Sequence, residues 1–259
     1  MNSLAARPRF AQDVAMELPT FDTTLALAAA VAFAAGLMRG FAGVGSGMLM
    51  APIFVQLFGP VETVATIIVM EVVVTVQLLA GVWREIAWRV IGPMGTAATL
   101  LMPLGSWLLV VLDPVLIGRA MAVIVLSFAV LLLAGWRYSG AKPLPATLGV
   151  GALSGILMAS TSLGNPPVMV YLLSGRDAAA RNRANFTGYF AVTLTALILW
   201  MLALGLITAT PVLRAALFLP LFMFAAWLGS RLFRQSSEQL YRRIALSLLV
   251  FVGLYALFR

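Results

Sequence analysis

The sequence contains neither cysteine nor histidine. Without cysteine there are no disulfides and no thiolate metal sites. Without histidine the chain lacks the commonest metal ligand and general base. Charged residues are also scarce, at 10% of the 259 residues, against about 25% in an ordinary soluble domain. These absences argue against an enzyme, and we expect no metal and no cofactor.

Apolar residues are correspondingly abundant. They make up 62% of the chain, and runs of about 20 residues, enough to cross a bilayer, recur from residue 22 onwards. This pattern predicts an all-α polytopic membrane protein. The net charge of +8 comes from cations in short loops, as in topology signals, so it does not indicate nucleic-acid binding. Residues 1–21 lack the apolar core of a signal peptide and are expected to form an N-terminal tail.

An interrupted apolar segment occurs twice. The first copy, Gly36 to Gly59, reads GLMRGFAGVGSGMLMAPIFVQLFG, and the second, Gly151 to Gly175, reads GALSGILMASTSLGNPPVMVYLLSG. In each copy glycines and small polar residues stop an apolar run, which then starts again. Backbone that leaves a helix at membrane depth must be buried in protein or line a cavity. Paired interruptions of this kind indicate the binding site of a transporter.

The interruptions belong to two four-segment halves. Repeat A (22–134) comprises a broken segment of 22–38 and 47–58, then 61–83, 88–111 and 115–134. After a linker at 135–145, repeat B (146–258) comprises 146–159 with 164–174, then 184–207, 211–230 and 240–258. Leu104-Gly105-Ser106 matches Leu228-Gly229-Ser230, which supports an internal duplication.

Positive charge predicts how the halves are oriented. If all eight segments cross the membrane, the loop cations divide equally between its two sides, without the usual excess inside. If each broken segment is a re-entrant hairpin and the N-terminus is outside, most cations lie inside: Arg84, Arg89, Arg137, Lys142, Arg176, Arg181, Arg183, Arg231, Arg234, Arg242 and Arg243. Each half then crosses three times, which predicts oppositely oriented, inverted repeats.

The two interruptions have the composition of an anion site. Free backbone N–H groups and the positive end of the helix dipole gather where a helix begins, and they bind anions without a charged side chain. Glycine permits close approach, and hydroxyl and amide groups donate hydrogen bonds. The expected substrate-binding residues are Gly43, Gly45, Ser46, Gly47, Ser160, Thr161, Ser162, Gly164 and Asn165. The alternative is that small residues only allow close helix packing, which we favour for Gly36, Gly40, Gly151 and Gly155.

Two ionisable residues lie within apolar segments. Arg39 stands at the first interruption, and Glu71 is the acid deepest within a span. Such groups face the protein interior or a pathway, so Arg39 is a substrate-binding candidate and Glu71 a proton-coupling candidate. The alternative is a structural ion pair between the two. Thr66, Gln77 and Asn185 are polar positions that could line a cavity, or hydrogen-bond between helices.

The chain resembles the sulfite exporter TauE/SafE family, also called the toluene sulfonate uptake permease family. The resemblance rests on GFAGVGSGMLMAP and GILMASTSLGNPPVMVYL, a glycine-rich stretch followed by proline in each half. It covers about residues 22–258. The tip Ser160-Thr161-Ser162 is less glycine-rich than the usual pattern. The resemblance implies transport of small sulfur-containing or organic anions such as sulfite or sulfonates.

The leading hypothesis is a secondary transporter, most simply an exporter, in a bacterial-type inner membrane. Its partners would be a small anion and the lipid bilayer, without nucleic acid, and a homodimer is one arrangement left open. Nothing resembles a nucleotide-binding motif, so an ion gradient or the substrate's own gradient would supply the energy. The rivals are an anion channel and a non-transporting membrane assembly subunit.

Overall fold

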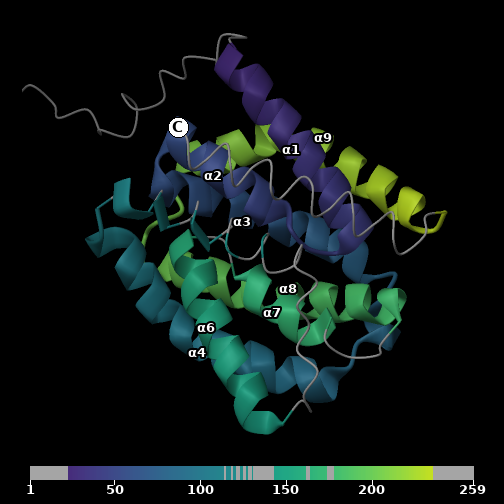
Figure 1. Cartoon of the computed structure of the whole chain (residues 1–259). Coiled ribbons are helices and arrows are strands. Elements are labelled where there is room, and N and C mark those ends of the chain that lie inside the picture. Colours follow the sequence, from purple (N-terminus) through teal and green to yellow (C-terminus); the bar gives the residue numbers. More distant parts are fainter. Residues whose placement is uncertain are drawn as a thin grey trace, which may run out of the picture.

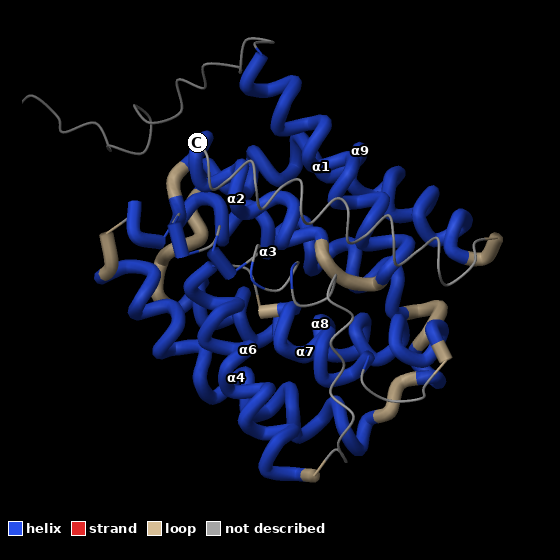
Figure 2. Tube along the Cα trace, in the orientation of Figure 1, coloured by secondary structure: helices blue, strands red, loops and turns tan. Residues whose placement is uncertain are grey.

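The computed structural model describes residues 23–113, 115–117, 119–120, 123–124, 127, 130, 143–161, 164–173 and 178–235. These residues form helices and connecting loops without any strand, which confirms the all-α prediction (Figure 2). The predicted tail, most of the predicted linker, about half of 115–134 and the whole of 240–258 lie outside the described residues.

The helices follow the apolar segments closely. The first half contains α1 (Thr23–Ala42), α2 (Ser46–Phe58), α3 (Pro60–Leu79), the short 3₁₀ turn η2 (Trp83–Glu85) and α4 (Trp88–Val111). The second half contains α6 (Leu144–Thr161), α7 (Asn165–Leu173), α8 (Ala179–Ala203) and α9 (Ala209–Phe233). Both predicted interruptions are present, but α1 ends at Ala42 instead of residue 38 because the helix continues through Arg39 and Gly40.

Six of these helices are long and apolar enough to cross a membrane: α1, α3, α4, α6, α8 and α9. With 13 and 9 residues, α2 and α7 are shorter than the roughly 20 residues that a span needs. The protein is therefore a multi-pass membrane protein, as its composition predicted.

Two helix pairs hold the outer parts of the bundle together. In Figure 1, α1 lies along α9 and α4 lies along α6, with α3 and α8 between the two pairs. Gly36 and Gly40 of α1 lie against the backbone of Phe222 and Ala226 of α9. A Cβ at either glycine would overlap a carbonyl group, so the close-packing interpretation is confirmed for both.

The α4–α6 pair is packed in the same way. Gly151 and Gly155 of α6 lie against the backbone of Met94 and Ala98 of α4. In both pairs the residue numbers of the two helices rise together along the contact. Thus α1 runs parallel to α9, and α6 runs parallel to α4.

After each interruption the chain turns back. The Phe54 ring of α2 lies 6.0 Å from the Phe218 ring, and the guanidinium of Arg214 lies 3.9 Å above the ring of Phe58. Since α2 thereby returns towards the start of α9, α1 and α2 form a hairpin with residues 43–45 at its tip. In the second half, the hydroxyls of Thr147 and Tyr171 lie 2.6 Å apart, so α7 likewise returns along α6.

The two hairpins point in opposite directions. The N–H of Ala87 donates to Asn185 at 2.8 Å and Gly95 packs on Val192, so α4 and α8 are parallel. Arg183, near the start of α8, donates to Ser230, near the end of α9, so α8 and α9 are antiparallel. Since α6 is parallel to α4 and α1 is parallel to α9, it follows that α1 and α6 are antiparallel.

Candidate functional site

The first hairpin tip has a backbone that glycine makes possible. Gly43 has φ of 75° and Gly45 has φ of 99°, a region that residues with a Cβ rarely adopt. The tip ends where α2 begins at Ser46. The two glycines therefore turn the chain sharply while leaving the start of α2 facing the protein interior.

Arg39 lies beside this tip and is fully buried. Its Nε donates to Oε2 of Glu71 at 2.9 Å, one Nη donates to Thr75 Oγ1 at 2.8 Å, and the other donates to the carbonyl of Gly43. Its guanidinium carbon also lies 4.3 Å above the centre of the Phe190 ring, a cation–π contact. Arg39 thus links α1, α3, α8 and the tip.

Glu71 completes the arrangement. Its second oxygen, Oε1, accepts a hydrogen bond from the hydroxyl of Ser46, the first residue of α2. The carboxylate therefore occupies the start of α2, where the helix dipole favours a negative charge. We call Arg39, Gly43, Ser46, Glu71 and Thr75 the ion-pair cluster. The structure thus shows the pairing of Arg39 with Glu71 that the sequence offered as one alternative.

The second tip has an uncharged version of the same arrangement. Ser154, at the position matching Arg39, donates to the carbonyl of Gly164 in the tip. Tyr189 of α8 donates to the Ser154 hydroxyl at 2.7 Å, much as Glu71 of α3 contacts Arg39. The charge of the site therefore comes from the first half.

The other candidates at the second tip differ in placement. The hydroxyl of Ser160 donates to Ile156 O at 2.8 Å, and that of Thr161 donates to Leu157 O at 2.6 Å, both bonds to the preceding helical turn. Asn165 is the first residue of α7, and Ser162 lies outside the described residues.

Glu71 also lines a small cavity. Its volume is about 10 Å³, about enough for one water molecule. It brings the two hairpins together, because Gly47 from the start of α2 and Met158 from near the end of α6 both line it. The remaining lining residues are Ile67, Ile68, Phe190 and Leu194.

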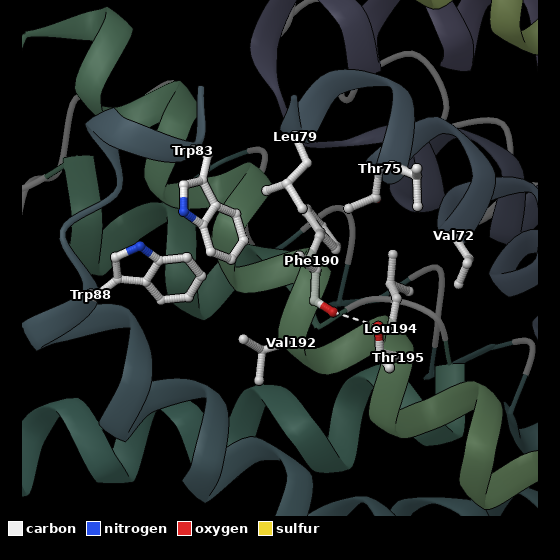
Figure 3. A pocket seen from close by; sticks show the side chains of 11 residues that line it. Val72, Thr75, Leu79, Trp83, Trp88, Phe190, Val192, Leu194 and Thr195 are labelled. Atoms are coloured by element: carbon white, nitrogen blue, oxygen red, sulfur yellow. Dashed lines mark hydrogen bonds between the residues drawn. The ribbon is translucent and has the colours of Figure 1, made fainter. Parts of the chain in front are cut away.

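A larger groove lies between α3 and α8 (Figure 3). Its volume is about 280 Å³, just below the usual range of roughly 300–1,000 Å³ for small-molecule pockets. Trp83 and Trp88 stand at one end and Val72 at the other, with Phe190 between them. Thr75 lines the groove on one side and accepts from Arg39 on the other. The groove therefore reaches the ion-pair cluster at Thr75, and it is also lined by Phe190, whose ring contacts Arg39.

The three cavity-lining candidates line neither the groove nor the small cavity. Thr66 is buried, and its hydroxyl has no hydrogen-bond partner among the described residues. Gln77 is exposed and lines neither the groove nor the small cavity. Asn185 is buried and accepts the N–H of Ala87, so it holds the loop before α4 against α8.

Several residues of the site were not predicted. Thr75 lies one helical turn after Glu71, and this i, i+4 spacing could have placed it on the same face. Phe190 and Tyr189 come from the other half of the chain, where no local pattern marks them. Arg183, counted as a loop cation, lies beside Gly43 and donates to Ser230 at 2.8 Å.

Within the described residues, no group of three acidic side chains could hold a metal ion. The site is thus a buried cation and carboxylate at a helix start, within an apolar bundle. Its chemistry is the binding of a small anion or the structural pairing of the two charges.

A comparison with protein-family models distinguishes the class of protein. The model of the sulfite exporter TauE/SafE matches residues 28–256, most of the chain. The chain belongs to the sulfite exporter TauE/SafE family. This membership confirms the resemblance seen in the sequence and indicates a membrane transporter of sulfur anions, in agreement with the expectation of a non-enzyme. No curated protein and no solved structure matches the chain.

Proposed function

We propose that this TauE/SafE protein is a secondary transporter that exports small sulfur-containing or organic anions, such as sulfite or sulfonates, across a bacterial-type inner membrane. The observation that carries the proposal is the fully buried guanidinium of Arg39 at the tip of a helical hairpin. A buried cation beside a helix start attracts an anion strongly, because little water screens it.

Alternating access would follow from the two opposed hairpins. We infer that α1–α2 and α6–α7 are re-entrant hairpins of two inverted repeats, each entering from a different side of the membrane. The antiparallel course of α1 and α6 supports this arrangement, as do the shared cavity contacts of Gly47 and Met158. Secondary transporters with inverted repeats bind their substrates at the midplane, where broken helices meet.

The groove between α3 and α8 would be the route to the site. Trp83 and Trp88 at one end of it are exposed, and Phe190 and Leu194 line both the groove and the small cavity. These two side chains stand as a wall between the groove and Glu71. Transport would require this wall to move, and the second tip with Ser160, Thr161, Ser162 and Asn165 would complete the site from the other side.

The experiment that tests the function is transport by the purified protein in lipid vesicles. Sulfite, thiosulfate, methanesulfonate and acetate would be loaded inside, and uptake of a labelled outer anion would be followed. A carrier gives saturable counterflow with its substrates, and the comparison of the sulfur anions with acetate shows whether carboxylates are among them. High flux without counterflow would favour the anion channel, and no flux together with no thermal stabilisation by any of these anions would favour the assembly subunit.

A further inference from the structure

We propose that the ionised carboxylate of Glu71 and the transported anion compete for Arg39, so that each anion bound is accompanied by one proton taken up by Glu71. The inference rests on the proposed function and deepens it by assigning the ion that moves with the anion and the group that carries it. Because proton and anion move together, export then requires an outward anion gradient that exceeds the inward proton gradient. When no substrate is bound, the carboxylate of Glu71 would occupy the position of the anion beside Arg39.

Space supplies the first argument. The cavity beside Glu71 holds about 10 Å³, far less than a sulfur oxyanion needs, and apolar side chains line the rest of it. An anion therefore cannot bind Arg39 beside the carboxylate as the two now lie. It must take the place of the carboxylate, and the carboxylate must withdraw.

Charge supplies the second argument. Arg39 and Glu71 form a neutral pair, with their side chains 0% and 4% exposed. An anion added to this pair would leave one uncompensated negative charge in a poorly solvated interior, which is costly. A proton from water that binds to the displaced carboxylate restores neutrality. The anion then pairs with Arg39 and the neutral carboxylic acid needs no cation.

The available hydrogen bonds suit this exchange. The carboxylate now accepts from Arg39 Nε and from the Ser46 hydroxyl at the start of α2. A sulfonate oxygen accepts hydrogen bonds from the same donors, and a sulfonate carries the same single negative charge as the carboxylate. Thr75 accepts from Arg39 and faces the groove, so its own hydroxyl proton is placed to meet an arriving anion.

Arg39 is the one charged group that contacts Glu71 in the described part of the chain. The elements packed around Glu71 otherwise present Ser46 and Gly47 from α2, Met158 from α6, and Phe190 and Leu194 from α8. The remaining titratable or charged side chains on these helices and on α9 make their described contacts elsewhere: Arg183 with Ser230, Tyr189 with Ser154, Arg214 with Glu62, and Arg231 with Trp227, while Arg181 is exposed.

The test counts protons during binding. Methanesulfonate and ethanesulfonate stay monoanions near neutral pH, so a proton taken up on their binding must go to the protein. Titration calorimetry of the full chain in two buffers of different ionisation heat gives the number. The wild type should take up about one proton per anion, and its affinity should fall about tenfold per pH unit in the alkaline range.

Two variants of α3 separate Glu71 from other acids. Glu71→Gln should bind the same anions at least tenfold more tightly, without proton uptake and with an affinity independent of pH. Glu62→Gln is the matched control, because Glu62 also lies on α3 and pairs with an arginine, but with its side chain 42% exposed. This control should behave like the wild type.

The outcomes distinguish the two proposals. Anion binding by the wild type without proton uptake would overturn the competition and leave the transporter intact. Proton uptake that persists in Glu71→Gln would overturn the assignment to Glu71. Binding of no anion by either the wild type or Glu71→Gln would overturn both proposals. Should Glu71→Gln fail to fold, the wild-type proton count still decides whether binding is coupled, and Glu71→Asp, which keeps the acid, should retain the count.

Discussion

Arg39 combines three hydrogen-bonded partners with an aromatic ring beneath its guanidinium. The hydrogen-bonded partners are Gly43 in the tip and Glu71 and Thr75 on α3, and the ring is that of Phe190 on α8. A buried charge is tolerated only when it is paired and its donors are satisfied. The side chain therefore stabilises the hairpin whether or not it also binds an anion.

A lysine at position 39 should fail to replace the arginine. Its ammonium group cannot reach Glu71, Thr75 and the Gly43 carbonyl together, because it lacks the planar fork of the guanidinium. We expect Arg39→Lys to lower the free energy of unfolding by about 1–3 kcal/mol. Tryptophan fluorescence during denaturation in detergent micelles measures this change.

The control for that substitution is Arg214→Lys. Arg214 also pairs with a glutamate of α3, at 2.7 Å, but the side chains are 19% and 42% exposed. Exposed ion pairs contribute up to about 1 kcal/mol, so this variant should be nearly as stable as the wild type. Equal losses of unfolding free energy in the two variants would contradict a larger contribution of Arg39 to stability.

Ser154 should matter for the second tip in the same way. Its hydroxyl donates to Gly164 and accepts from Tyr189, and both contacts are buried. Ser154→Ala leaves the Tyr189 hydroxyl without this partner, so we expect a loss of about 1–3 kcal/mol in unfolding free energy. Thr195→Ala, which removes an exposed hydroxyl bonded to Ala191 within α8, should change stability little in the same denaturation assay.

At the scale of elements, backbone contact through glycine holds the helix pairs. Gly151 and Gly149 lie two residues apart on α6, but only Gly151 faces another helix, where it meets the backbone of Met94. Nothing lies within 4 Å of a Cβ built at Gly149. Alanine at position 151 would therefore overlap α4, whereas alanine at position 149 would change only the helix propensity of α6.

We expect Gly151→Ala to destabilise the protein by about 1–3 kcal/mol, because the methyl group must push α6 away from α4. Gly149→Ala should be neutral or stabilising by up to about 1 kcal/mol, since alanine favours a helix over glycine. Thermal unfolding of the two variants, compared in one detergent, measures both. A destabilising Gly149→Ala or a neutral Gly151→Ala would contradict the packing described here.

The helix boundaries show which ends of helices could be predicted from local sequence patterns. The sequence predicted 88–111, and α4 spans those residues; it predicted a second helix from 47, and α2 begins at Ser46. Glycine and proline mark such ends locally. The end of α1 was placed four residues early because Arg39 and Gly40 resemble a break, although packing against α9 keeps them helical.

At the scale of the whole molecule, the proposed inverted repeats predict which loops share a side of the membrane. The loop before α8 and the end of α9 should both lie inside, while the loops after α4 and before α9 should lie outside. The native chain has no cysteine, so single cysteines can report each loop without background.

We expect Ala178→Cys and Gln235→Cys to react with a membrane-impermeant maleimide only after the cells are opened. Asp113→Cys and Thr208→Cys should react in intact cells whose outer membrane is permeable. All four positions are exposed, so access to the reagent depends on the side of the membrane. Labelling of Ala178→Cys and Gln235→Cys in intact cells would contradict the proposed orientation.

The sequence by itself determined the class of the protein. The long apolar runs require helices, since lipid leaves no other partner for the backbone. The two interruptions predicted tight turns between helices, and the sequence motifs at these interruptions resembled those of the TauE/SafE family. These properties depend on residues close together in the chain, where composition and spacing act directly.

Only the tertiary structure decided what Arg39 and Glu71 do to each other. They lie 32 residues apart, and a sequence pattern cannot say which side chains of two separate helices meet. The same holds for Phe190, which comes from the other half of the chain and meets Arg39 only after the helices pack. The packing of the helices, rather than the local sequence, determines which side chain lies next to a buried charge, and here it places Glu71 beside Arg39.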